Sequence, residues 1–376
     1  MTSRRKFLTA SGLAIGAVGL RAAAQTSGDS KRTLSPKAAK PLRLLILGGT
    51  GFIGPHEVRY ALERGHRVTL FNRGKTQPSL FPEVEKLQGD RATGNYESLK
   101  GREWDVVVDN PTTLPRWVRQ AAEVLQKHVK QYVFISSISV YARNDQRNAA
   151  ETAEVATTDQ PQSEDAGKYY GPLKALSEKE AERAFPGRAA ILRPGLIVGP
   201  GDLSDRFTYW PVRFERGGEV LAPGAPTDPV QIIDARDLSE FVIRVAENND
   251  TGVYNCTGPR SRLTIAEMLG GVRAVTASDA YLTWVPADFL EGHQVRPWVD
   301  MPTWVPPSVE RAGFATRNID RALAKGLRFR PLAATAKETL DFYNSQPEAR
   351  KEKLRAGLPQ NREKEVLAAW QARPNP

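Results

Sequence analysis

The sequence has few of the residues that build disulfides and metal sites. Cys256 is the single cysteine among 376 residues, so no disulfide can form within the chain. No histidine lies at ligand spacing from another histidine or from the cysteine. There are four histidines in all: His56, His66, His128 and His293. We therefore predict no metal site, and we expect the hydrophobic core alone to stabilise the fold.

Acidic residues are rare at the N-terminus, and this accounts for most of the positive charge of the chain. The formal net charge is +10, of which +4 lies in residues 1–24 and +3 in residues 25–40, leaving +3 for the rest. Beyond residue 40 no basic block contains interleaved aromatic residues, which is the pattern typical of nucleic-acid binding. The charge of the body therefore predicts no nucleic-acid partner.

The apolar run near the N-terminus, residues 13–20, is too short to span a bilayer. It follows the adjacent Arg4 and Arg5 and precedes three small residues that end at Ala24. This layout predicts a twin-arginine signal peptide over residues 1–24. It implies the twin-arginine export machinery as a partner, a periplasmic or otherwise exported location, and no membrane attachment after cleavage. The alternative is a basic N-terminus without defined structure.

Apolar runs alternate with helical patterns from residue 41 onward. The runs LRLLILGG at 42–49, WDVVVDN at 104–110 and YVFISSISVY at 132–141 are typical of strands buried on both faces. The stretch PHEVRYALERG is typical of a helix, with Pro55 near its first turn and Gly65 at its end. The alternation predicts an α/β fold, a doubly wound parallel Rossmann sheet with a smaller C-terminal substrate lobe.

The composition changes after Gly199, where prolines and tryptophans become frequent. The last helical stretch carries Leu367 and Trp370 on one side, and it is either a strap across the body or a contact in a homodimer. The predicted parts are a linker at 25–40, a dinucleotide-binding domain at 41–199 plus 230–250, a substrate-binding lobe at 200–229 plus 252–330, and a C-terminal helical tail at 331–376.

Three glycines follow the first predicted strand at intervals of three residues, in the segment GGTGFIG. The first allows a tight turn, the second lets the backbone approach a pyrophosphate, and the third lets the following helix pack against the strand. The phosphates would then lie at the positive end of that helix. The predicted cofactor-binding residues of this loop are Gly48, Thr50, Gly51, Phe52, Ile53 and Gly54.

The end of the second predicted strand indicates which dinucleotide binds. Asn72 stands where an acidic residue would hold the ribose hydroxyls of NAD, and Arg73 and Lys75 follow it. A guanidinium pairs with a 2′-phosphate, whereas a carboxylate repels it. We therefore predict that Asn72 and Arg73 bind the cofactor and that NADP is preferred over NAD. The alternative is that Arg73 is a solvated charge in a loop.

The segment KYYGPLK places Tyr170 and Lys174 four residues apart, with Pro172 in the first turn of a predicted helix. This spacing brings both side chains to one helix face. A free tyrosine is a weak base at neutral pH, but a nearby ammonium group favours its phenolate form. Tyr170 is then suited to proton transfer with a substrate hydroxyl. Three serines at the end of the strand FISSISVY are candidate donors to the substrate oxygen: Ser136, Ser137 and Ser139.

In these motifs the chain resembles the extended short-chain dehydrogenase/reductase family, in its NAD-dependent epimerase/dehydratase group. The resemblance covers roughly Leu42 to Pro331 and rests on TGFIG, SSISVY, YGPLK and LRPGLIVGPGD. It implies that Ser137 is the catalytic serine and Tyr170 the general acid/base. It further implies that Lys174 holds the nicotinamide ribose and tunes Tyr170.

The chain departs from this family after its predicted fourth strand. Where the family usually has His-x-Ala-Ala, this chain has DNPTT, which begins at Asp109. The resemblance places Asp109 beside the cofactor, but the departure leaves the substrate type open. Further candidates for substrate contact are Ser139, Tyr209, Trp210 and His293, although Tyr209 and Trp210 fit core packing equally well. Asp234 and Asp237 are interpreted as residues that orient loops.

The resemblance and the predicted export signal together restrict the reaction. Sugar nucleotides, the typical substrates of the family, are cytoplasmic, as is the machinery that regenerates NADP. We therefore favour a redox-neutral reaction of the epimerase/dehydratase type, with tightly bound cofactor, on a hydroxyl or carbonyl of a carbohydrate or polyol. The alternative enzyme is a simple NADPH-dependent carbonyl reductase, similar to isoflavone reductases. The alternative of another class is a non-catalytic RNA-binding relative of the fold, to which TLFNRGK bears some likeness.

Overall fold

The structure is a computed structural model that describes residues 36–110 and 113–374. The predicted signal peptide at 1–24 and most of the linker lie outside the described residues, as do Pro111 and Thr112. No helix within the described ranges is both long and apolar enough to cross a membrane.

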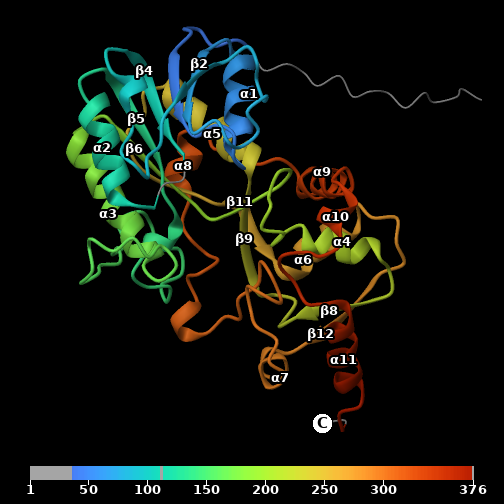
Figure 1. The fold of residues 1–376 in the computed structure, drawn as a ribbon. Coiled ribbons are helices and arrows are strands. Elements are labelled where there is room, and N and C mark those ends of the chain that lie inside the picture. The colour runs from blue at the N-terminus through green and yellow to red at the C-terminus, as the bar shows by residue number, and fades with distance from the viewer. Residues whose placement is uncertain (1–35, 111–112, 375–376) are drawn as a thin grey trace, which may run out of the picture. The chain divides into compact units, whose positions relative to one another are not determined.

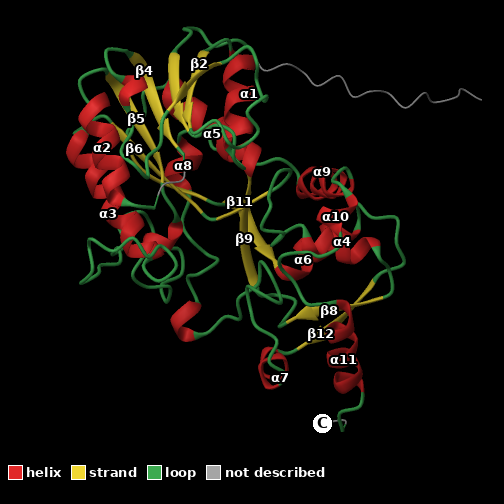
Figure 2. Ribbon diagram, viewed as in Figure 1, coloured by secondary structure: helices red, strands yellow, loops and turns green. Residues whose placement is uncertain are grey.

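The central element is a seven-stranded sheet in the order β10-β6-β5-β4-β1-β2-β3, with every neighbouring pair parallel (Figures 1 and 2). This confirms the predicted doubly wound Rossmann sheet. The strand order reverses between β1 and β4, which is where ligands bind in such folds. The strands are β1 (Arg43–Leu47), β2 (Arg67–Asn72), β3 (Glu85–Gln88), β4 (Trp104–Asp109), β5 (Val129–Ile135), β6 (Ala189–Pro194) and β10 (Gly252–Cys256).

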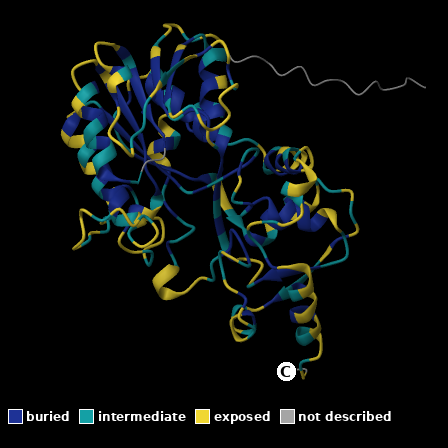
Figure 3. Ribbon diagram, viewed as in Figure 1, coloured by how far each residue is buried: buried dark blue, intermediate teal, exposed yellow. Residues whose placement is uncertain are grey.

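Helices cover both faces of this sheet because successive strand residues point to opposite sides. In β1, Leu44 and Ile46 pack in one core with α1 (Gly54–Arg64) and α5 (Ala235–Glu247). The alternate residues of β1 pack in a second core with α2 (Pro115–Leu125) and α3 (Tyr170–Ala184). Figure 3 shows the strands of the sheet buried between the two helical layers.

The first helix begins and ends where the sequence predicts. Pro55 lies in the first turn of α1, where its missing N–H costs no hydrogen bond. Gly65 ends the helix with φ of 89°, a left-handed conformation that glycine adopts without strain. The start of α1 is thereby fixed directly after the glycine loop.

The second part of the chain is a lobe with its own core. Its strands form a three-stranded sheet, β11-β9-β7, and a parallel pair, β12-β8. Trp210 and Trp304 are fully buried in its core. The strands are β7 (Leu196–Val198), β8 (Glu219–Pro223), β9 (Pro229–Asp234), β11 (Gly258–Thr264) and β12 (Tyr281–Val285); the helices are α4 (Tyr209–Glu215), α6 (Ile265–Arg273), α7 (Ala287–Gly292), α9 (Leu332–Asn344), α10 (Glu348–Lys351) and α11 (Gln360–Gln371). The short helix α8 (Asp320–Ala324) packs instead against β10 of the main sheet.

The boundaries between the two parts differ from the predicted ones. The strand that returns to the main sheet is β10, within the range assigned to the lobe, whereas β9 pairs with β7 and β11. Leu327 also packs in the core of the main sheet. The tail packs on the lobe, where Leu367 is buried and the Trp370 ring lies 4.8 Å from Phe289. The change in composition after Gly199 indicates where the lobe begins, whereas the pairing of the strands sets the boundary between the lobe and the main sheet.

Candidate active site

The glycine loop between β1 and α1 has the geometry of a phosphate site. Gly48 has φ of 110°, which a residue with a side chain rarely adopts. A Cβ atom on Gly54 would lie 2.5 Å from the backbone of Gly49, so the helix packs directly on the loop. A Cβ on Gly51 would meet no atom within 4 Å. The loop is therefore open on the side where a pyrophosphate would approach the free N–H groups of α1.

A pocket of about 480 Å³ lies against this loop. All six predicted loop residues line it, together with Asn72 and Arg73. The volume suits a small-molecule or cofactor site. Further lining residues were not predicted, and they come from the loop after β3, the end of β4, α2 and β7: Gly89, Asp90, Arg91, Ala92, Asn110, Trp117 and Ile197.

The turn after β2 leaves two cations available to a ligand. The Asn72 side chain donates a hydrogen bond to the Gly48 carbonyl at 3.0 Å and accepts one from the Gly74 N–H at 2.8 Å. An aspartate in this place could not donate to Gly48. Arg73 and Lys75 are exposed, line the pocket, and have no hydrogen-bond or ion-pair partner among the described residues. Both are free to pair with a phosphate.

Asp109 lies at the end of β4 but does not line the pocket. Its carboxylate is fully buried, pairs with Arg91 at 2.6 Å, and accepts a hydrogen bond from the Tyr132 hydroxyl. Burial and the carboxylate of Asp109 raise the pKa of Tyr132, which keeps this donor protonated. The pocket wall at this strand end is Asn110 instead. Asp109 thus holds Arg91, which does line the pocket, and its own contact with a cofactor stays a prediction.

Lys174 is fully buried beneath the end of β5. Its ammonium group donates a hydrogen bond to the Ile135 carbonyl at 2.7 Å and lies 4.9 Å from the centre of the Phe134 ring. Burial lowers the pKa of Lys174 to about 7, although the nearby Asp109 and Glu178 carboxylates act in the opposite direction. Near neutral pH the charged and neutral forms of this lysine are therefore close in free energy.

Tyr170 and the serine turn come from different elements that pack closely. Tyr170 is the first residue of α3, as predicted, and its side chain is 39% exposed. Ser137 caps a short turn by accepting a hydrogen bond from the Ser139 N–H at 3.1 Å. A Cβ on Gly171 would lie 2.2 Å from the Ser139 carbonyl oxygen, so the helix start lies directly against the turn. The start of α3 and the serine turn therefore lie side by side after β5. Ser137, Tyr170 and Lys174 do not line the pocket, and among the described residues no hydrogen bond joins Tyr170 to Ser137 or Lys174.

The sequence analysis did not single out Glu178 as a residue that fixes this arrangement. Glu178 lies on the same face of α3 as Lys174, one turn later. It accepts hydrogen bonds from the Ser136 hydroxyl and, at 2.9 and 2.7 Å, from the Arg193 guanidinium of β6. All three residues are buried. Lys174 and Glu178 together hold α3 in register with the end of β5. Glu178 could have been predicted to lie on this helix face, because it follows Lys174 by four residues.

The four residues predicted to contact substrate do not gather in one place. Ser139 lies in the serine turn beside Ser137. Tyr209 and Trp210 are core residues of the lobe, with ring centres 4.9 Å apart, and the Trp210 indole donates to the Pro302 carbonyl at 2.8 Å. Their burial removes both from the candidate site, and core packing explains them. His293 ends α7, stacks on Phe289 at 4.1 Å, and does not line the pocket.

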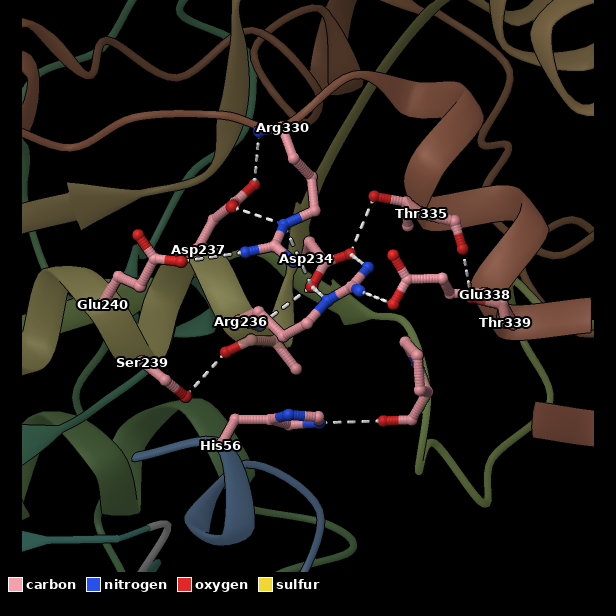
Figure 4. Close-up of polar contacts among 12 residues, drawn as sticks. His56, Asp234, Arg236, Asp237, Ser239, Glu240, Arg330, Thr335, Glu338 and Thr339 are labelled. Carbon is pink, nitrogen blue, oxygen red and sulfur yellow. Dashed lines mark hydrogen bonds and ion pairs between the residues drawn. The ribbon is translucent and has the colours of Figure 1, made fainter. Parts of the chain in front are cut away.

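A polar cluster joins the nucleotide side to the lobe (Figure 4). The His56 ring, in the first turn of α1, lies 2.9 Å from the Pro200 carbonyl in the turn after β7. Asp234 caps α5 and accepts a hydrogen bond from Thr335 of α9 at 2.7 Å. Asp237 pairs with Arg330 at 2.7 Å. Asp234 and Asp237 therefore orient connecting segments, in line with their interpretation from the sequence. In residues 36–110 and 113–374, no three His, Cys, Asp or Glu side chains gather as metal ligands do.

Comparison with known families and structures agrees with this geometry. The family model described as "NAD dependent epimerase/dehydratase family" matches residues 44–96 and 104–257. The fold is similar to that of the UDP-Glc/GlcNAc 4-epimerase of Campylobacter jejuni, with a TM-score of 0.59 and 15% identity over 80% of this chain and 98% of that one. The human epimerase family protein SDR39U1, solved with NADPH, matches at a TM-score of 0.54 and 20% identity, over 80% and 99%. At these identities the likeness shows the fold.

Two curated proteins are similar in sequence. The chloroplast stem-loop binding protein of 41 kDa b from Arabidopsis thaliana is 26% identical over 250 residues, 61% of this chain and 62% of that protein. The 2-alkyl-3-oxoalkanoate reductase of Stenotrophomonas maltophilia is 29% identical over 178 residues, 43% and 52%. The matched regions thus span less than two thirds of either relative.

Proposed function

Since the chain belongs to the NAD dependent epimerase/dehydratase family, we propose that it is an NAD(P)-dependent enzyme acting on a hydroxyl or carbonyl of a carbohydrate or polyol. One observation carries this proposal. The pocket at the glycine loop and the group Ser137, Tyr170 and Lys174 lie at the carboxyl ends of neighbouring parallel strands. A dinucleotide bound at the loop can reach across these strand ends toward the tyrosine.

The residues of the chain have distinct tasks in this reaction. The bound dinucleotide supplies the hydride acceptor or donor. Tyr170, which is partly exposed, takes the proton of the substrate hydroxyl or returns it to the carbonyl oxygen. Ser137 donates a hydrogen bond to that oxygen. Lys174 favours the phenolate of Tyr170 when it is charged, and its contact with Ile135 fixes its position.

NADP is the cofactor we favour. Arg73 and Lys75 line the pocket without partners, and Asn72 adds no negative charge there. A 2′-phosphate would pair with the guanidinium of Arg73. Among proteins of similar fold, the human one was solved with NADPH, and the WbmH enzyme of Bordetella bronchiseptica was solved with NAD+.

The predicted export signal supports a redox-neutral reaction with retained cofactor, because an exported enzyme has no cytoplasmic supply of reduced nucleotide. The test is to mix the protein carrying its nucleotide with a panel of free sugars and polyols. Reduced nicotinamide should appear and then return to its starting level as the sugar is converted. Tyr170→Phe, which keeps the ring but removes the hydroxyl, should slow this by roughly 10²- to 10⁴-fold. An unchanged rate would remove Tyr170 from the mechanism.

Two other functions are distinguished by simple outcomes. The likeness to 2-alkyl-3-oxoalkanoate reductase favours a carbonyl reductase as the second candidate, which would consume NADPH steadily without returning it. The likeness to the chloroplast stem-loop binding protein favours an RNA-binding role. Salt-sensitive binding of an RNA stem-loop without any turnover would support that role and overturn the enzymatic proposal.

A further inference from the structure

Glu57 is an acidic residue on the buried side of α1, where apolar residues such as Val58 and Ala61 also lie. It lies in the first turn of α1 and is fully buried. One carboxylate oxygen accepts a hydrogen bond from the Asn110 side chain at 2.6 Å. The other is buried and has no hydrogen-bond partner among the described residues. A buried carboxylate with an unpaired oxygen costs free energy when it is ionised, so its presence needs an explanation.

The carboxylate is one hydrogen bond away from the nucleotide pocket. Its partner Asn110 lines that pocket, and so do Ile53 and Gly54 at the start of the same helix. The positive end of α1 favours any anion placed in its first turn. The pyrophosphate of a dinucleotide and an ionised Glu57 would therefore share one helix end. Two negative groups at one weakly solvated site repel each other.

Burial is what sets the protonation of Glu57. It raises the pKa of Glu57 to about 7, while the hydrogen bond from Asn110 acts in the opposite direction. No ionised side chain contributes to this shift. Near neutral pH the group is therefore able to gain or lose a proton at little cost.

The other charged groups around the loop are of both signs. Burial lowers the pKa of His56 and so disfavours its charged form. Lys174 changes charge near pH 7 and must be controlled for in any experiment. The remaining groups are Arg59 on α1, Arg73 and Lys75 after β2, Asp90 and Arg91 after β3, and Asp109 at the end of β4. Asp109 is paired with Arg91.

We propose that binding of the dinucleotide to this chain is coupled to the uptake of a proton by Glu57. The inference rests on the proposed nucleotide site. When the pyrophosphate occupies the start of α1, an ionised Glu57 is repelled and takes up a proton from solvent. Nucleotide affinity is then highest where Glu57 is already protonated and falls as the pH rises above 7. No bond other than the O–H bond of the carboxyl group forms or breaks.

The experiment measures the dissociation constant of NAD by calorimetry from about pH 6 to about pH 9. NAD is the probe because it lacks the 2′-phosphate of NADP, which titrates near pH 6. We expect Kd to increase by roughly tenfold across this range, which corresponds to one unit of pKa coupling. Repeating the titration in two buffers of different ionisation enthalpy should show uptake of about half a proton near pH 7.5, since one unit of coupling separates the free and bound titrations.

Two variants separate Glu57 from other groups. Glu57→Gln keeps the shape and can still accept from Asn110, but cannot ionise, so its Kd should be independent of pH and its binding should take up no proton. Lys174→Met should retain the pH dependence of the wild-type chain. A dependence that survives in Glu57→Gln and disappears in Lys174→Met would overturn the inference, as would a Kd that is constant with pH in the wild-type chain. Failure of NAD and NADP to bind at any pH would instead refute the proposed function.

Discussion

At the scale of single residues, the nucleotide site is built mainly from backbone and from side chains that hold other side chains. Asn72 holds the glycine loop, and Asp109 holds Arg91. Arg73 is different, because it lines the pocket without a partner. Residues of the first kind set the shape of the site, whereas Arg73 is available to select the ligand.

Arg73→Ala should therefore weaken NADP binding far more than NAD binding. The expected loss for NADP is about 1.5–3 kcal/mol, roughly ten- to a hundredfold in Kd, as for a hydrogen bond to a charged group. Equilibrium titration with each nucleotide measures it. Equal losses for NADP and NAD would mean that Arg73 makes no contact with the 2′-phosphate.

The buried ammonium group of Lys174 should lower the stability of the fold although the proposed reaction needs it. Its folded-state pKa of about 7 lies below the unfolded value of 10.5, so the unfolded chain binds more protons between these two values. Stability of the nucleotide-free protein should rise as the pH rises through this window, and the cost of the buried charge should be complete below pH 7.

Lys174→Met removes this cost and should stabilise the nucleotide-free protein by a few kcal/mol at pH 6, with a much smaller gain near pH 10. Urea unfolding at both pH values is the measurement. The variant should nevertheless lose turnover. An equal change in unfolding free energy at the two pH values would contradict the assigned cause.

At the scale of elements, the two motifs that could be predicted are those confined to one short segment. The glycine loop follows β1 directly, and Tyr170 and Lys174 share one helix. Asp90, Trp117 and Ile197 could not be predicted, because they reach the pocket from the loop after β3, from α2 and from β7, which only the tertiary fold brings together. Tyr209 and Trp210 were open to two interpretations, and only the packing of the lobe decides that they are core. A parallel, doubly wound sheet could be predicted from the alternation of strands and helices. The order of its strands and their register could not.

The position of α3 against β6 depends on the buried pair of Glu178 and Arg193. Glu178→Ala would leave the Arg193 guanidinium buried without its carboxylate and should destabilise the protein by about 3–5 kcal/mol. Lys179→Ala, an exposed neighbour on the same helix, is the matched control and should change stability by less than about 0.5 kcal/mol. Similar unfolding midpoints for both variants would mean that the pair does not hold the helix.

At the scale of the whole molecule, the open question is how an enzyme of this family would work outside the cytoplasm. The proposed twin-arginine signal at residues 1–24 is one half of the answer, because that route carries folded proteins. Replacing Arg4 and Arg5 with lysine should hold the precursor in the cytoplasm. Cell fractionation with an antibody to the chain measures this. Normal accumulation of the double variant in the periplasm would argue against the signal.

The other half is the cofactor, which we expect to travel inside the folded protein. Backbone N–H groups of the glycine loop and the free charges of Arg73 and Lys75 favour slow release, and differences in affinity lie mostly in the dissociation rate. The exported form, dialysed extensively and then denatured, should release NADP or NAD in near-stoichiometric amount, as identified by mass. Arg73→Ala is the matched control and should retain less NADP. If the exported protein contains neither nucleotide, and its activity depends on cofactor added at ordinary micromolar levels, then the enzyme is a conventional dehydrogenase. A redox-neutral cycle would then no longer be needed to account for its chemistry.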